Sequence, residues 1–417
     1  MTGGTPVVPT PVGARRRSPV PAHTRPSHLP HLFVGPRCLC YRLVRDQHAK
    51  AQRPGVGGRD VNVAQAKQTA AAWVESNLAA WPGLQAAHLV GGITSLADHA
   101  PWPTHKDLDM HLVFAEGSPA LEPKGPFPEM IEVPYEGLSI EGGLKSIVEY
   151  RSVEAVLANP EIAHHIMVGC SLYDPHGILA GLERGVRPEY ARRRWVQARL
   201  AYEREGLAGV LAMRPVDPAM PDLSRGAMVL GYTSTFIAAA CSVATLLAPT
   251  TGSRGILRTR DVLCGHRHAD LYEALLELYG TATVRAAEVE AFLCEGMAAF
   301  DLAVAVRRSP HPFQHKLHAH LKPYFVESCR NLIAEGFSRE AMLWLTPFYH
   351  SSIDVILTDG PECEKAGARA RHERFLAAIG LDSDTAMSAA FDRAVPLFDE
   401  CFAVADEIVA CHPKIVD

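Results

Sequence analysis

The stretch Asp107-Leu-Asp-Met-His-Leu-Val-Phe114 decides how the first half of this 417-residue chain is interpreted. It alternates at first and then becomes fully apolar, which is typical of a central β-strand. Side chains two residues apart on a strand point to the same face, so both aspartates are expected on one face of a sheet. Two carboxylates placed in this way repel each other unless a divalent cation lies between them. The stretch therefore predicts a strand that carries a metal site.

A glycine pair, Gly91-Gly92, stands before this strand and after a shorter strand expected at Leu84 to Val90. Glycine allows the backbone to approach a triphosphate closely, and a helix N-terminus that follows can face the anion. We therefore expect the phosphates of a nucleotide near Gly91 and Gly92.

A third carboxylate on a neighbouring strand would complete a site for two metal ions. Glu132 lies between apolar residues in a third expected strand, Met130 to Ile140. Glu136 shares its face if the period of two continues, and Glu141 is a further candidate. Two Mg²⁺ ions held by three carboxylates stabilise the attacking and the leaving oxygens of a phosphoryl displacement.

The chain contains a second Asp-x-Asp pattern, Asp382-Ser-Asp384. No glycine pair precedes it and no apolar run follows it. Because this context is missing, we expect a solvated loop or a helix cap there.

The first constellation resembles the nucleotidyltransferase superfamily that includes DNA polymerase beta, and its layout is closest to the kanamycin and aminoglycoside nucleotidyltransferases. The matching residues are Gly91-Gly92, Asp107, Asp109 and Glu132, with a spacer of 14 residues after the glycines. The turn Leu172-Tyr-Asp-Pro-His-Gly177 is similar to the segment that joins the two domains in that branch. The resemblance implies that a nucleoside monophosphate is transferred from an NTP to a hydroxyl or related group, with release of pyrophosphate.

The resemblance also assigns roles to individual residues. Asp107, Asp109 and Glu132 would hold two Mg²⁺ ions, and ATP is the expected NTP. Gly91, Gly92 and Ser95 would bind the nucleotide. By their position after the third expected strand, Lys145 and Arg151 are further candidates for the triphosphate, and the basic run Arg192-Arg-Arg194 is either a solvated helix face or another phosphate contact. The general base stays open between Glu132, Glu136 and a residue of the helical part, Asp261 or Glu295. The acceptor would be a small molecule such as an antibiotic or natural product, and a homodimer is compatible with this branch.

The expected fold is α+β, with a small mixed-sheet nucleotidyltransferase domain followed by an all-α domain. Residues 1–60 contain nine prolines and seven glycines and are expected to be a disordered Pro/Arg-rich tail, with a transit peptide as the alternative. Residues 61–180 would form the catalytic domain, and 181–417 the helical acceptor-binding domain. Helices are expected at 63–80, 144–158, 160–168, 188–212, 226–248, 266–279, 285–307, 316–336, 338–357, 365–379 and 385–411.

Charge and composition narrow the class of partner. Residues 1–60 carry ten basic and two acidic residues, so the rest of the chain has a net charge of −13. An acidic body disfavours nucleic acid and suits a cationic acceptor. No run approaches about 18 apolar residues, so no membrane span is expected. The ten scattered cysteines contain no CxxC, which predicts buried thiols in a reducing cytoplasm.

Two histidine-rich segments have simpler interpretations than a zinc site. Cys264-Gly-His-Arg-His268 lacks a second ligand pair, and His311 to His320 is interpreted as a polar loop or the rim of a substrate cleft. Two other functions remain open: a toxin-like or regulatory nucleotidyltransferase that acts on tRNA or protein, and a non-catalytic nucleotide-binding scaffold.

Overall fold

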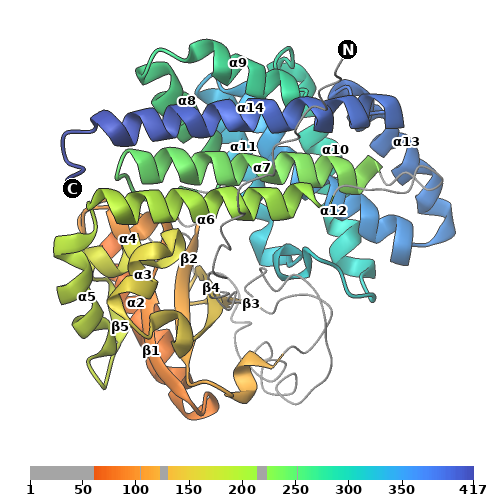
Figure 1. Ribbon diagram of the computed structural model, residues 1–417. Coiled ribbons are helices and arrows are strands. Elements are labelled where there is room, and N and C mark those ends of the chain that lie inside the picture. The colour runs from red at the N-terminus through yellow and green to blue at the C-terminus, as the bar shows by residue number, and fades with distance from the viewer. Residues whose placement is uncertain (1–60, 104, 123–129, 214–222, 251) are drawn as a thin grey trace, which may run out of the picture.

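The computed structural model describes residues 61–103, 105–122, 130–213, 223–250 and 252–417 (Figure 1). The Pro/Arg-rich tail predicted at 1–60 lies outside these residues. The described chain combines a five-stranded mixed sheet with many helices, which is consistent with the α+β class expected from the sequence.

The sheet has the strand order β3-β4-β2-β1-β5. β2 (Asp107–Phe114) lies at its centre, parallel to β4 (Leu138–Ser146) and antiparallel to β1 (Leu84–Leu89). β3 (Met130–Tyr135) and β5 (Ser171–Tyr173) form the antiparallel edges. The prediction that 107–114 is a central strand is confirmed, as is the strand expected at 84–90.

The prediction of one strand over 130–140 was wrong in its length, because the chain turns at Glu136-Gly137 to form the β3–β4 hairpin. Both turn residues have positive φ, 48° and 84°. β4 then runs to Ser146, which overturns the helix expected from 144; only the short η4 (Ile147–Tyr150) and α3 (Val153–Ala158) follow. The glycines of β4 fit bulky neighbours: a Cβ on Gly142 would stand 3.1 Å from a methyl of Leu112.

One face of the sheet is a conventional apolar core. Leu108, Met110, Leu112 and Phe114 alternate along β2 and are buried against α2 (Val63–Asn77). Asn62 caps this helix by accepting a hydrogen bond from the backbone N–H of Gln65. Burial of these side chains fixes the register of β2 and so fixes which of its residues point to the opposite face of the sheet.

The opposite face divides into an apolar end and a charged end. At the apolar end, Ala86 and Val113 are buried with side chains from α3, α4 (Pro160–Val168) and α5 (Ile178–Glu189). Asp107 and Asp109 occupy the other end of the same face. The helix expected at 160–168 is confirmed, whereas Pro188 lies near the end of α5 and does not begin the next helix.

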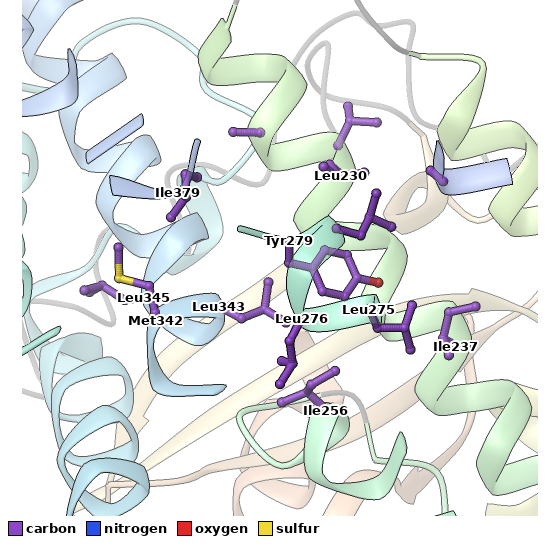
Figure 2. Close-up of a cluster of buried hydrophobic side chains, with 14 of the residues drawn as sticks. Leu230, Ile237, Ile256, Leu275, Leu276, Tyr279, Met342, Leu343, Leu345 and Ile379 are labelled. Atoms are coloured by element: carbon purple, nitrogen blue, oxygen red, sulfur yellow. The ribbon is translucent and has the colours of Figure 1, made fainter. Parts of the chain in front are cut away.

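The remaining helices share one large hydrophobic cluster. Figure 1 shows α6 (Arg193–Leu211), α7 (Leu223–Ala244) and α14 (Asp384–Cys411) side by side. Figure 2 shows Tyr279 surrounded by buried aliphatic side chains of several helices. The other helices are α8 (Gly255–Gly265), α9 (Ala269–Leu278), α10 (Ala286–Val306), α11 (Lys322–Ala334), α12 (Ser338–Asp359) and α13 (Glu362–Ala378). The sequence analysis missed α8 and placed the start of α11 too early.

Helix α7 is long and apolar enough, by length and composition, to cross a membrane. However, 67% of its most apolar window, within Arg225–Ala244, is buried inside the protein. It contacts α6, α8, α12 and α14. This packing is that of a buried core helix.

The described cysteines are all free thiols. Cys241, Cys329 and Cys401 are buried, as expected. The prediction of buried thiols was wrong for four others, which are exposed: Cys264, Cys294, Cys363 and Cys411.

Candidate metal and nucleotide site

Acidic side chains from three neighbouring strands meet at the charged end of the sheet. The register pairs Asp109 with Glu141 and Glu141 with Glu132, so these residues form a row across β2, β4 and β3. Asp107 precedes Asp109 by two residues and shares its face. The expectation that Asp107 and Asp109 share one face is confirmed, and Glu132 lies close to them.

A lysine from the helical part of the chain lies within this acidic cluster. Lys316, in the short turn η5 (Gln314–Lys316), donates to Asp107 Oδ2 at 2.6 Å and to Glu132 Oε2 at 3.1 Å. It also donates to Glu141 Oε2. The sequence analysis missed Lys316, because no spacing rule connects it to a carboxylate some 200 residues away. The sequence analysis interpreted its segment, 311–320, as a polar loop or the rim of a substrate cleft.

The carboxyl groups respond differently to burial. Burial opposes the charge of Asp107, but the Lys316 ammonium holds the pKa of this carboxyl below its ordinary value. Burial, followed by the charges of Asp107 and Glu141, raises the pKa of Asp109 well above its ordinary value. Burial also raises the pKa of Glu141 to about 7, although Lys316 opposes the shift. One ammonium therefore does not offset the charge that four carboxylates would carry.

The oxygen ligands suit a divalent cation. Among the described residues, one oxygen each from Asp107, Asp109 and Glu141 lie within 4.8 Å of one another. Mg²⁺ prefers oxygen donors and is commonly bound by a few carboxylates together with substrate phosphates. Glu141, the further candidate of the sequence analysis, belongs to this group because its strand lies beside β2, whereas Glu132 does not belong to it. Glu132 accepts a hydrogen bond from Ser139 Oγ at 2.8 Å and borders the group.

The glycine pair lies beside Asp109, as the sequence pattern requires. The backbone N–H of Val90 donates to the carbonyl of Asp109 at 2.9 Å, and the short turn η2 (Gly91–Ser95) follows. Gly91 has a φ of 68°, and a Cβ there would collide with Oδ2 of Asp109. No described atom lies within 4 Å of where a Cβ on Gly92 would stand, so this position is open. Ser95 is exposed at the end of the turn.

Lys145 and two arginines of the basic run, which the sequence analysis expected at a triphosphate, form ion pairs with acidic side chains. Lys145 is on β4, four residues beyond Glu141, or about 13 Å along a strand. Its ammonium pairs with Glu161 at 2.8 Å and Glu149 at 3.8 Å. Within the run 192–194, Arg193 pairs with Asp417 at 2.6 Å and Arg194 pairs with Glu189 at 2.7 Å.

The general-base candidates also separate. Glu136 is exposed in the hairpin turn, so the period of two that would have placed it beside Glu132 is broken. Asp261 pairs with Arg260, and Glu295 accepts hydrogen bonds from Tyr349 and Arg374. Only Glu132 among these candidates lies within the acidic cluster.

Neutral histidines separate the acidic cluster from the apolar end of this face. His111 Nδ1 and His88 Nε2 lie 3.0 and 2.8 Å from the hydroxyl of Tyr150. Burial lowers the pKa of His111 well below its ordinary value and that of His88 to about 4. Both rings are therefore neutral near pH 7 and add no charge to the site.

No protein-family model matches this chain, and no curated protein matches it. Function is therefore inferred from the site itself.

Proposed function

We propose that this protein is a Mg²⁺-dependent nucleotidyltransferase that moves a nucleoside monophosphate from an NTP to a small-molecule hydroxyl and releases pyrophosphate. The observation that supports this proposal is the row of carboxylates beside a positive-φ glycine, on one face of a mixed sheet. In this proposal residues 61–180 are the catalytic domain, and the helices of 181–417 provide the acceptor site.

Each acidic residue has a role in the proposed site. Asp107, Asp109 and Glu141 would hold Mg²⁺, which stabilises charge on the phosphoryl oxygens when it is bound. Glu132 remains outside this trio and is the proposed acceptor for the proton of the attacking hydroxyl. The open backbone at Gly92 gives the phosphates room to approach without a side chain in the way.

The acceptor is proposed to be a cationic small molecule. The chain beyond residue 60 carries a net charge of −13, which would attract such a compound and repel nucleic acid. An aminoglycoside-like antibiotic or natural product in the cytoplasm, with ATP as donor, fits this chemistry.

The experiment is a thermal-shift scan of the full chain with each of the four NTPs, with and without Mg²⁺, together with an assay of pyrophosphate release. A ligand at 100 times its Kd stabilises a protein by about 2.7 kcal/mol, which such a scan detects. We expect a Mg²⁺-dependent shift with one NTP, which Asp107→Asn removes. Absence of any Mg²⁺-dependent shift would contradict the proposal.

A non-catalytic nucleotide-binding scaffold is the second candidate. It is favoured by the contact of Lys316 with three carboxylates, because an ammonium can substitute for a metal in a site that performs no chemistry. NTP binding without Mg²⁺-dependent pyrophosphate release, tested with cationic acceptors, tRNA and total protein, would favour the scaffold.

A further inference from the structure

We propose that Lys316 is an internal cation that competes with the divalent metal for the same carboxylates, so that metal binding displaces its ammonium from the sheet. This inference rests on the proposed function, because it concerns how the proposed metal site becomes loaded. It adds a residue from the helical part of the chain to the control of that site.

The first argument is that lysine and metal share ligands. Asp107 and Glu141 belong both to the group of oxygens that can surround a metal and to the hydrogen-bond partners of Lys316. An Mg²⁺ ion bound through Asp107 Oδ2 would lie no more than about 4.7 Å from Nζ, given a metal–oxygen bond of about 2.1 Å and the 2.6 Å hydrogen bond. Two cations this close in a partly buried site repel strongly.

The second argument is that the ammonium can leave without unfolding its segment. Leu317 and Leu321 are buried beside it, and Arg308 and Ser309 bond to Asp359 at the start of the segment. These contacts hold the backbone while the four-carbon side chain can rotate. The ring of Tyr324, whose centroid is 5.0 Å from Nζ, already contacts the ammonium in its present position.

The third argument concerns charge. Lys316 donates hydrogen bonds to three of the four carboxylates, and Asp109 is not among its partners. Lys106 is a second lysine whose charge acts on Asp107 and Asp109. A divalent ion brings twice the charge of the ammonium that it would displace, and so favours the ionised form of all the carboxylates that bind it. Lys316 therefore fits the role of a counter-ion that stabilises the cluster until metal arrives.

The test measures the binding of Mn²⁺ alone to the full-length wild-type chain, to Lys316→Met and to the control Lys322→Met. Lys322 is more exposed, lies in the same region and pairs with Asp301, outside the acidic cluster. We expect Lys316→Met to bind Mn²⁺ at least about tenfold more tightly, because a repelling charge has been removed. Lys322→Met should bind as the wild type does.

A second measurement uses the wild-type chain and does not depend on the folding of a variant. An amine-acetylating reagent, followed by mass spectrometry, should modify Lys316 faster once Mn²⁺ is added, whereas Lys322 should react at an unchanged rate. Equal Mn²⁺ affinity in wild type and Lys316→Met, or labelling of Lys316 that bound Mn²⁺ leaves unchanged, overturns the inference alone. If neither wild type nor Lys316→Met binds Mn²⁺, the proposed metal-dependent function fails together with it.

Discussion

The chain contains the same Asp-x-Asp pattern twice, and the two copies have different surroundings. Asp107 and Asp109 lie on a central strand, beside two glutamates and a lysine. Asp382 and Asp384 are exposed at the start of α14, where Ser383 accepts a hydrogen bond from the backbone N–H of Ala386. The expectation of a helix cap at 382–384 is confirmed. The comparison shows that the neighbours of a carboxylate pair, and not the pair itself, distinguish a candidate metal site from a cap.

The largest expected effect is a difference in the rate of pyrophosphate release between the variants Asp109→Asn and Asp384→Asn. A bound metal supplies several kcal/mol of transition-state stabilisation, so Asp109→Asn should lower the rate of pyrophosphate release at least about a thousandfold. Asp384→Asn should leave the rate unchanged. Steady-state rates of the two purified variants give the answer, and equal rates would remove the functional distinction between the two copies.

Glu203 tests how burial outside the acidic cluster changes the pKa of a carboxyl group and, through it, the stability of the fold. It lies on α6, and burial followed by the charge of Glu161 raises its pKa to about 8. A carboxyl with a raised pKa supports the folded state fully below about pH 4.5, and this support is lost as the pH rises through about 8. Glu203→Gln should therefore match the wild type near pH 4.5 and be more stable above pH 8, by on the order of a few kcal/mol.

Denaturant unfolding of wild type and Glu203→Gln across this pH range measures the effect. Glu205→Gln is the matched control, because Glu205 is exposed on the same helix. A constant difference between wild type and Glu203→Gln at every pH would contradict the prediction.

Substitutions in the glycine pair, which lies only beside the first Asp-x-Asp copy, should have a smaller effect on stability. An alanine at Gly91 must adopt a left-handed conformation, at a cost of roughly 1–2 kcal/mol, and its Cβ would meet Asp109. Gly92→Ala should change stability by less than about 0.5 kcal/mol, because its side-chain position is open. Thermal unfolding checks both values.

The affinity for NTP tests whether phosphates lie at the second glycine, Gly92. If phosphates approach the open backbone, Gly92→Ala weakens NTP binding although the fold is as stable as before. Unchanged NTP affinity in Gly92→Ala would argue against a phosphate contact at this position.

The smallest expected effect is a loss of stability at the second Asp-x-Asp pattern, Asp382-Ser-Asp384. Ser383→Ala removes the cap of α14 and should lower the free energy of unfolding by about 1 kcal/mol. Pyrophosphate release should be unaffected, since the cap lies outside the acidic cluster. A loss of activity in a folded Ser383→Ala protein would connect α14 to the site and weaken the comparison.

The local sequence pattern predicted those helices and strands in which apolar residues recur at a regular spacing. The strand at 107–114 and the helices near 63–80, 160–168 and 385–411 have clear periods and were found close to their observed bounds. The β3–β4 hairpin was missed because its turn begins with Glu136 at positive φ, where a glycine or asparagine would have been the usual signal. Pro188 was misplaced because a proline near the end of a helix resembles one in a first turn.

By itself, the sequence determined that Asp107 and Asp109 share a face, because residues two apart on a strand point to the same side. It also contained the glycine pair, which is separated from Asp107 by 14 residues. Only the tertiary structure decided which other side chains join them. Glu141 enters the cluster because β4 pairs in parallel with β2, and Lys316 enters because a turn before α11 lies over the sheet. Strand pairing and the burial of charge bring together residues that are far apart along the chain, and no local period records those contacts.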